Sequence, residues 1–261
     1  MGILNVTPDS FSDGGQFTTI ETAVARAQAM VAEGADWVDI GGESTRPGAE
    51  RVPAQEQIRR VIPVLRGLRG RIGCLLSIDT SLAAVAEAAI DEGAHVVNDV
   101  SAGRDDPALF PLVARRKVSI VLMHMPEQPA TMQIAPYYRN VTKDVLDFLS
   151  ERVKVAAKSG IDGSRILIDP GIGFGKTTAH DLELLRNLAQ FRSLGRPTVL
   201  GTSRKKFVAA VTGAQDRERV FGTAATISWG IANGADVVRV HDVAAMSQVV
   251  RMARAIQNGE R

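Results

Sequence analysis

Short apolar runs alternate along the chain with stretches in which apolar residues recur every three or four positions. Short apolar runs between turn formers are typical of buried parallel strands, and the intervening spacing is typical of one face of a helix. The predicted strands are residues 3–6, 37–40, 75–78, 96–100, 118–123, 166–168, 198–200 and 237–240. The helices predicted after the first lie at about 54–69, 81–92, 107–116, 140–159, 178–190, 219–233 and 242–257.

The first helix has start and stop signals. Thr18 and Glu21 form a capping-box pattern, and Gly34 ends the apolar periodicity. Strict alternation of strands and helices gives a parallel sheet, and eight pairs close most economically into a barrel of about 250 residues. We therefore expect an α/β fold, a (β/α)8 TIM barrel, with residues 1–261 forming a single domain.

A weak repeat supports this arrangement. Gly-Ala-Asp or Gly-Ala-His begins at positions 34, 93 and 234, and five residues after each Gly come Asp39, Asn98 and Arg239. Polar side chains are costly inside an apolar interior, so we expect the three to line one shared mouth. The alternative is three separately satisfied structural residues.

The connections also differ in length at the two ends of the predicted barrel. Those from helix to strand are minimal, whereas several from strand to helix are long: 7–17, 41–53, 125–139 and 171–178. Barrels of this type keep their chemistry where strands lead into helices. The long connections therefore mark the expected functional face.

Composition narrows the class of protein. Hydrophobic residues make up 45% of the chain, enough for a full core. The 31 basic and 29 acidic residues are interspersed, which argues against a nucleic-acid partner. There is no apolar run long enough for a membrane span, and no apolar signal segment near residue 1, so we expect a cytoplasmic protein. A single cysteine, Cys74, excludes an internal disulfide and a cysteine-cluster metal site.

Charged and amide side chains gather at the predicted strand ends. One group lies near the helices after strands seven and eight, where such barrels commonly bind phosphate: Ser203, Arg204, Arg239 and His241. Across the mouth lie three polar residues that suit a ring with paired N–H donors: Asp79, Asn98 and Asp169. The sequence thus predicts a site for an anionic small molecule.

Several of these residues have structural alternatives. Thr80 or Ser81 could cap the third helix and Asp242 the eighth, and a packed or bridging role is favoured for His124. No hydrolase-type nucleophile elbow is present, and four histidines without His-x-x-x-His spacing argue against zinc. The stretch 171–177 imitates a phosphate-binding loop, but Pro170 replaces its first glycine. We expect its glycines to allow a flat ligand to approach, with Phe174 as an aromatic wall.

The motifs at these strand ends resemble those of the dihydropteroate synthase family. The two longest matches are residues 1–15 (MGILNVTPDSFSDGG) and 39–48 (DIGGESTRPG). Shorter matches follow in order at 77–80 (SIDT), 98–100 (NDV), 169–174 (DPGIGF), 203–205 (SRK) and 239–242 (RVHD). They extend over nearly the whole chain, and two signatures of this length are hard to obtain by chance.

The resemblance implies that 4-aminobenzoate condenses with (7,8-dihydropterin-6-yl)methyl diphosphate to give 7,8-dihydropteroate and diphosphate, in folate synthesis. It implies these residues for the pterin diphosphate: Thr45, Asp79, Asn98, Asp169, Lys205, Arg239 and His241. It implies these for the aminobenzoate: Thr45, Arg46, Pro47, Phe174 and Ser203. Asn5 would bind Mg²⁺, and the catalytic residues would be Asp79, Lys205, Asp13 and Phe11, the last two on a first loop that closes with the second. The family also implies a homodimer.

The sequence departs from the family pattern at two places, and two other functions compete with dihydropteroate synthesis. The chain begins inside the first predicted strand, which we therefore expect to be shortened, and Lys206 occupies a position that varies in the family. A pterin-binding methyltransferase would share the pterin pocket but have no use for a diphosphate clamp of Arg239 and His241. A non-catalytic pterin-binding paralogue would usually have broken loop signatures, and here both are intact.

Overall fold

A closed barrel of parallel strands forms the centre of the molecule. The computed structural model describes residues 1–6, 16–43, 51–126, 136–215 and 218–259. The strands are β1 (Gly2–Asn5), β2 (Trp37–Gly41), β3 (Leu75–Asp79), β4 (Val96–Asp99), β5 (Ser119–Met123), β6 (Ile166–Asp169), β7 (Val199–Leu200) and β8 (Val237–Val238). All eight predicted strands are therefore confirmed, with shorter ends at β7 and β8.

Parallel pairing runs continuously around the barrel. Strands β1 to β6 pair in chain order, and β7 pairs with β8. Two isolated bridges join these sheets, Ile168 to Thr198 and Gly2 to Val240. At the second junction the N–H of Ile3 donates to the carbonyl of Val240 at 2.9 Å. The predicted (β/α)8 barrel is thus confirmed.

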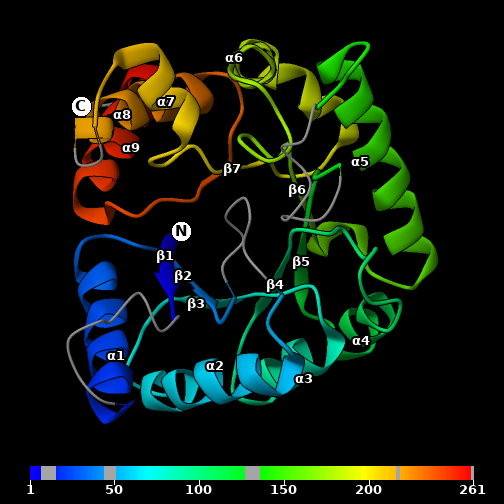
Figure 1. Cartoon of the computed structure of the whole chain (residues 1–261), viewed down its shortest axis with the longest axis vertical. Coiled ribbons are helices and arrows are strands. Elements are labelled where there is room, and N and C mark those ends of the chain that lie inside the picture. Colours follow the sequence, from blue (N-terminus) through cyan, green and yellow to red (C-terminus); the bar gives the residue numbers. More distant parts are fainter. Residues whose placement is uncertain (7–15, 44–50, 127–135, 216–217, 260–261) are drawn as a thin grey trace.

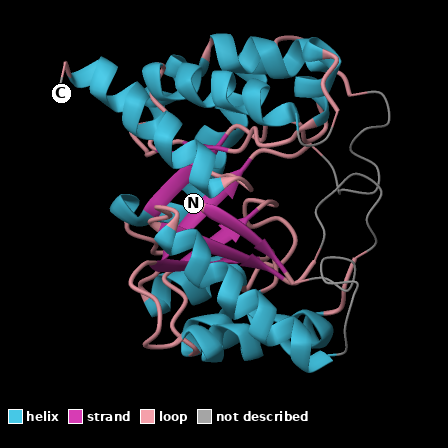
Figure 2. Cartoon of the chain, turned by 90° about the vertical axis from the view of Figure 1, so that its left-hand side faces the viewer, coloured by secondary structure: helices cyan, strands magenta, loops and turns pink. Residues whose placement is uncertain are grey.

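Helices surround the strands (Figures 1 and 2). They are α1 (Gln16–Ala32), α2 (Ala54–Leu68), α3 (Ala83–Asp91), α4 (Leu109–Arg116), α5 (Val141–Lys158), α6 (Thr178–Arg186), α7 (Lys206–Thr212), α8 (Arg219–Ala232) and α9 (Val243–Asn258), with short 3-10 helices at Gly163–Arg165 and Leu188–Leu194. Within the described residues, none is both long and apolar enough to cross a membrane.

Two details of the helices differ from the sequence expectations. Helix α1 begins at Gln16, so Thr18 lies inside the helix and the predicted cap there is wrong. Helix α7 was not expected, because seven residues show too little periodicity to identify. Elsewhere a side-chain cap fixes a start that the sequence placed correctly: the Asn140 side chain accepts from the N–H of Lys143 at 2.9 Å at the start of α5.

The alternating direction of side chains along each strand separates an apolar layer from a polar layer inside the barrel. One apolar cluster contains Val96, Val121, Leu167 and Val199, with Trp37 and Val237 packed against it. Successive side chains on a strand point to opposite faces, so residues two positions further along point the same way. These residues are Asn98, Met123, Asp169, Gly201, Asp39 and Arg239. The polar layer therefore lies directly next to the apolar one, toward the carboxyl ends of the strands.

Candidate functional site

Four residues from neighbouring strands form a row at the carboxyl end of the barrel. Asn5 is in register with Gly41, Gly41 with Asp79, and Asp79 with Asn98. A side chain added at Gly41 would place its Cβ 3.8 Å from Oδ1 of Asn5 and 3.7 Å from Oδ2 of Asp79. Glycine therefore leaves the Asn5 amide and the Asp79 carboxylate facing a common space.

Asp39 of β2 connects the end of β4 with the residue that follows β8. Its Oδ2 accepts from Nδ2 of Asn98 at 3.0 Å and from Nε of Arg239 at 2.7 Å. Nη2 of Arg239 donates to Oδ2 of Asp79 at 2.7 Å. The three residues of the sequence repeat, Asp39, Asn98 and Arg239, are thus bonded in one network. Asn98 and Arg239 line a cavity, whereas Asp39 is fully buried and outside its lining, so the predicted shared mouth is confirmed for two of the three residues.

Burial controls the charge of this network. Asp79 is buried, and loss of hydration raises the pKa of its carboxyl to about 7, although Arg239 acts in the opposite direction. Burial alone would lower the pKa of the Arg239 guanidinium, but Asp39 and Asp79 outweigh this and raise it. One cation is therefore shared between two carboxylates, leaving negative charge for a cationic partner.

Asp169, at the end of β6, and Lys205, before α7, form a second charged group across the mouth. Oδ1 of Asp169 accepts from the N–H of Gly171 at 2.7 Å. Nζ of Lys205 donates to the carbonyl of Ile172 and lies 4.4 Å from the centre of the Phe174 ring. Burial raises the pKa of Asp169 and lowers that of Lys205 to about 8, while their mutual attraction opposes both shifts.

The glycines after β6 are explained by the protein's own atoms. Gly171 has φ +68°, and an added Cβ would lie 1.9 Å from the carbonyl oxygen of His124. Gly173 has φ +78°, and an added Cβ would lie 2.7 Å from Cδ of Lys205. The sequence-based explanation, close approach of a ligand, is therefore not needed to account for either residue.

The residues after β7 and β8 are paired with one another. Oγ of Ser203 accepts from the N–H of His241 at 3.1 Å and lies 3.0 Å from its Nδ1. Arg204, expected near the anion, forms two hydrogen bonds to Asp242, one of them at 2.9 Å. Asp242 is the N-cap residue of α9 but makes no side-chain hydrogen bond there, so the alternative of a side-chain cap is not realised. The Asp242 carboxylate instead balances Arg204.

One cavity brings most of the predicted site residues together. Its lining includes Asp79, Asn98, Asp169, Phe174, Ser203, Lys205, Arg239 and His241. It also includes apolar residues that the sequence analysis did not single out, namely Ile3, Val100 and Met123. Their apolar strands gave no signal that separated a cavity wall from ordinary core. Asn5, the predicted Mg²⁺ ligand, is described but does not belong to the cavity lining. The other predicted residues, Phe11, Asp13, Thr45, Arg46 and Pro47, lie outside the described residues.

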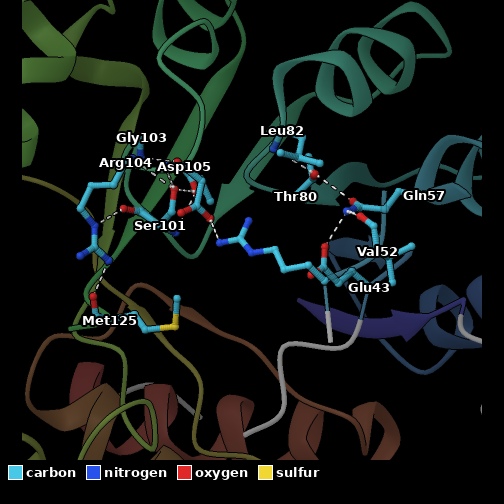
Figure 3. Close-up of polar contacts among 12 residues, drawn as sticks. Glu43, Val52, Gln57, Thr80, Leu82, Ser101, Gly103, Arg104, Asp105 and Met125 are labelled. Carbon is cyan, nitrogen blue, oxygen red and sulfur yellow. Dashed lines mark hydrogen bonds and ion pairs between the residues drawn. The ribbon is translucent and has the colours of Figure 1, made fainter. Parts of the chain in front are cut away.

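A polar network centred on Gln57 of α2 links the ends of β2 and β3 (Figure 3). Nε2 of Gln57 donates to Oε2 of Glu43 at 2.5 Å and to the carbonyl of Val52 at 2.9 Å, and its Oε1 accepts from Oγ1 of Thr80 at 3.1 Å. This single amide thus joins both flanks of segment 44–50 to the strand end that carries Asp79. Thr80 accepts from the N–H of Leu82, the residue preceding α3, so it lies one turn short of the helix start.

The donor set offers little to hold a metal ion by itself. Among the described residues, no group of three His, Cys, Asp or Glu side chains is arranged to bind one. The Asn5 amide oxygen beside Asp79 is a suitable oxygen ligand for Mg²⁺. These residues fit an ion whose other ligands come from a phosphorylated substrate and water.

Comparisons with known proteins identify the family of this chain. The pterin binding enzyme family model matches residues 1–241. Dihydropteroate synthase of Synechocystis sp. is 45% identical over 257 residues, covering 98% of this chain and 89% of the relative. Xanthomonas albilineans dihydropteroate synthase with 4-aminobenzoic acid has a TM-score of 0.93 and 47% identity, covering 98% of this chain and 92% of that one. The same enzyme in complex with 7,8-dihydropteroate gives 0.89 and 44%, with the same coverage. The chain therefore belongs to the dihydropteroate synthase family of pterin binding enzymes.

Proposed function

We propose that this chain joins 4-aminobenzoate to (7,8-dihydropterin-6-yl)methyl diphosphate, releasing diphosphate and 7,8-dihydropteroate for folate synthesis in the cytoplasm. Residues 1–261 would act as one pterin-binding barrel domain. The observation that carries the proposal is the cavity at the carboxyl ends of the strands, which combines buried carboxylates with cations. The similarity to dihydropteroate synthases over nearly the whole chain supports it.

The pterin ring would lie among Asp79, Asn98, Asp169 and Lys205. A carboxylate can accept two parallel N–H donors from an amino-pyrimidinone edge, and this fixes the orientation of the ring. Asp169 has one oxygen occupied by Gly171, which leaves its other oxygen for the ligand. Lys205 can donate to a ring carbonyl in exchange for its bond to Ile172.

The diphosphate would lie toward Arg239, His241, Asn5 and Thr45. Arg239 keeps its guanidinium in place through Asp39 and Asp79, so its orientation is set before the anion arrives. Ser203 orients the His241 ring in the same way. Mg²⁺, held by Asn5 and diphosphate oxygens, would supply positive charge that stabilises the departing diphosphate.

The reaction needs one bond broken and one formed. The bond between the methylene carbon and the diphosphate oxygen breaks with its electron pair leaving on diphosphate. The amine nitrogen of 4-aminobenzoate then forms the new bond to carbon and gives up one proton. A delocalised pterin cation is stabilised by Asp79 and Asp169, and Arg239 and His241 stabilise the leaving anion, so no strong general base is required.

The aminobenzoate would bind between Phe174, Ser203 and the second loop, with Thr45, Arg46 and Pro47. Phe174 offers a ring face at the cavity wall, beside the Lys205 ammonium. Phe11 and Asp13 of the first loop would complete the catalytic set with Asp79 and Lys205. These assignments on residues 11–13 and 45–47 follow from the family motifs.

A homodimer is supported by exposed apolar side chains on two adjoining helices. Helices α8 and α9 pack against each other at one side of the barrel (Figure 1). Phe221, Trp229, Met252 and Ile256 on these helices are each at least half exposed. Exposed apolar side chains gathered on two adjoining helices are typical of a two-fold interface between identical subunits.

Product analysis tests the proposed function. Purified protein incubated with pterin diphosphate, 4-aminobenzoate and Mg²⁺ should form 7,8-dihydropteroate, identified by mass spectrometry. Asp79→Asn should abolish or greatly reduce the product while retaining the wild-type circular dichroism spectrum. Absence of product from the folded wild-type protein would contradict the proposal.

A further inference from the structure

A buried ammonium group organises the loop between β6 and α6. Lys176 is buried, and its Nζ donates to the carbonyl of Gly171 at 2.8 Å and to that of Phe174 at 2.9 Å. It also lies 3.0 Å from Nδ1 of His124. An ammonium carries three donors, and these three acceptors match them one for one. Burial lowers the pKa of Lys176, and the negative charge of Asp181 partly offsets this effect.

His124 supplies the third acceptor from a different strand. It follows β5, and its backbone N–H donates to the carbonyl of Asp169 at 2.9 Å. Its ring packs edge-on against that of Phe148, with 4.9 Å between the ring centres. Burial, reinforced by the charge of Lys176, lowers the pKa of His124 to about 2, so the imidazole is neutral and Nδ1 can accept. The expectation of a packed or bridging role for His124 agrees with these contacts.

The loop held by Lys176 shapes one wall of the site. The N–H of Phe174 donates to the carbonyl of Gly171 at 3.1 Å, which closes a turn, and Lys176 binds the carbonyls at both ends of that turn. The same Gly171 donates to Asp169, and the Phe174 side chain lines the cavity. Within the described part of the chain, Lys176 and His124 themselves are outside the cavity lining.

We propose that Lys176 is a positioning residue for the condensation: together with His124 it holds the turn that presents Phe174 and orients Asp169 from behind the pocket. The inference rests on the proposed function, because the roles of Phe174 and Asp169 do. Lys205 contacts the same loop from the cavity side, through Ile172. The loop is therefore fixed by one cation in the site and one outside it.

The test compares two substitutions that remove the Lys176–His124 contact with one that preserves an acceptor for Lys176. Lys176→Met keeps an unbranched side chain that is one atom shorter and has no donors, and His124→Leu removes the third acceptor. His124→Asn retains an acceptor near the place of Nδ1. Lys158→Met, at the exposed end of α5, is the matched control.

In Lys176→Met and His124→Leu the KM for both substrates should rise about fivefold or more, and kcat should change much less. A rise of about fivefold is the smallest effect expected when a buried polar group loses its partner. Amide hydrogen exchange of the peptide 170–177 should become faster while peptides from β3 and β4 keep wild-type rates. His124→Asn should restore a KM near that of the wild type. Lys158→Met should have the wild-type KM, kcat and exchange rates.

Unchanged KM and unchanged local exchange in both disruptive variants would overturn the inference. Exchange accelerated across the whole chain, with no split between KM and kcat, would also overturn it, because that indicates only a general structural role. If Lys176→Met does not fold, His124→Leu and its rescue by Asn decide the question. An inactive wild-type protein would remove the proposed function, and the exchange comparison would still decide whether Lys176 holds the turn.

Discussion

Replacing Asp169 by Asn tests the pterin pocket with a change of one atom. Oδ1 of Asp169 accepts from the N–H of Gly171 at 2.7 Å. In the variant the amide oxygen has to keep that position, because an NH2 group there would face another donor. The NH2 group therefore takes the position of the second oxygen, which in the proposed complex accepts a ring N–H. Two donors then meet, and one acceptor for the pterin is lost.

The expected loss follows from the burial of this residue. An unpaired buried polar group costs about 1 to 3 kcal/mol, which corresponds to roughly 5- to 150-fold weaker binding of the pterin substrate. Folding should not suffer. Burial raises the pKa of Asp169, so ionising this carboxyl in the folded protein lowers the free energy of unfolding when the pH rises above that pKa. The neutral Asn side chain does not ionise and avoids this loss.

Calorimetric titration with the pterin diphosphate, alongside thermal unfolding at neutral pH, separates the two effects. The exposed Asp147→Asn substitution on α5 is the control and should leave both the affinity and the melting temperature unchanged. Unchanged pterin affinity in Asp169→Asn would remove this carboxylate from the pocket. A large fall in melting temperature would show that the residue has a structural role that we have not recognised.

Four further predictions concern binding order, pH, backbone strain and the Gln57 network. 4-Aminobenzoate should bind only after pterin diphosphate, or after diphosphate with Mg²⁺, and equal affinity for the apo protein in calorimetry would refute the order. Pterin affinity should increase as Asp79 ionises through about pH 7 and decrease as Lys205 loses its proton above about pH 8, so a flat profile from pH 6 to 9 would contradict the assigned charges. Gly171→Ala should lower the melting temperature more than Gly70→Ala. Gly70 has a similar φ of +69°, but nothing lies within 4 Å of a Cβ added there. Equal losses of melting temperature would show that the clash at residue 171 is relieved. Gln57→Leu should raise the KM for 4-aminobenzoate more than the KM for the pterin in steady-state assays, because its amide joins both flanks of segment 44–50, and equal effects would argue against this role.

Local patterns were sufficient to predict the barrel and the gathering of polar residues at one end. Alternation along each strand fixes which residues share a face, so the repeat that contains Asp39, Asn98 and Arg239 could be identified before any contact was known. The number of helices was less predictable, because α7 has only seven residues. Thr18 matched a cap pattern, but the helix extends past it.

Pairings between distant residues were beyond the reach of sequence patterns. Lys176 and His124 are separated by 52 residues, and neither position carries a periodic signal that refers to the other. The partner of Arg204 is another example: the sequence placed Arg204 among the anion-binding residues, whereas the structure pairs it with Asp242, 38 residues away. Such contacts depend on where two loops meet, and the loop conformation decides that.

Diphosphate release tests the central claim most directly. Purified protein with pterin diphosphate and Mg²⁺ is assayed for diphosphate with and without 4-aminobenzoate, and dihydropteroate is quantified in the same samples. Sustained release is expected only when both substrates are present, with one diphosphate formed for each dihydropteroate. Sustained release that is independent of 4-aminobenzoate, or no release with both substrates present, would contradict it.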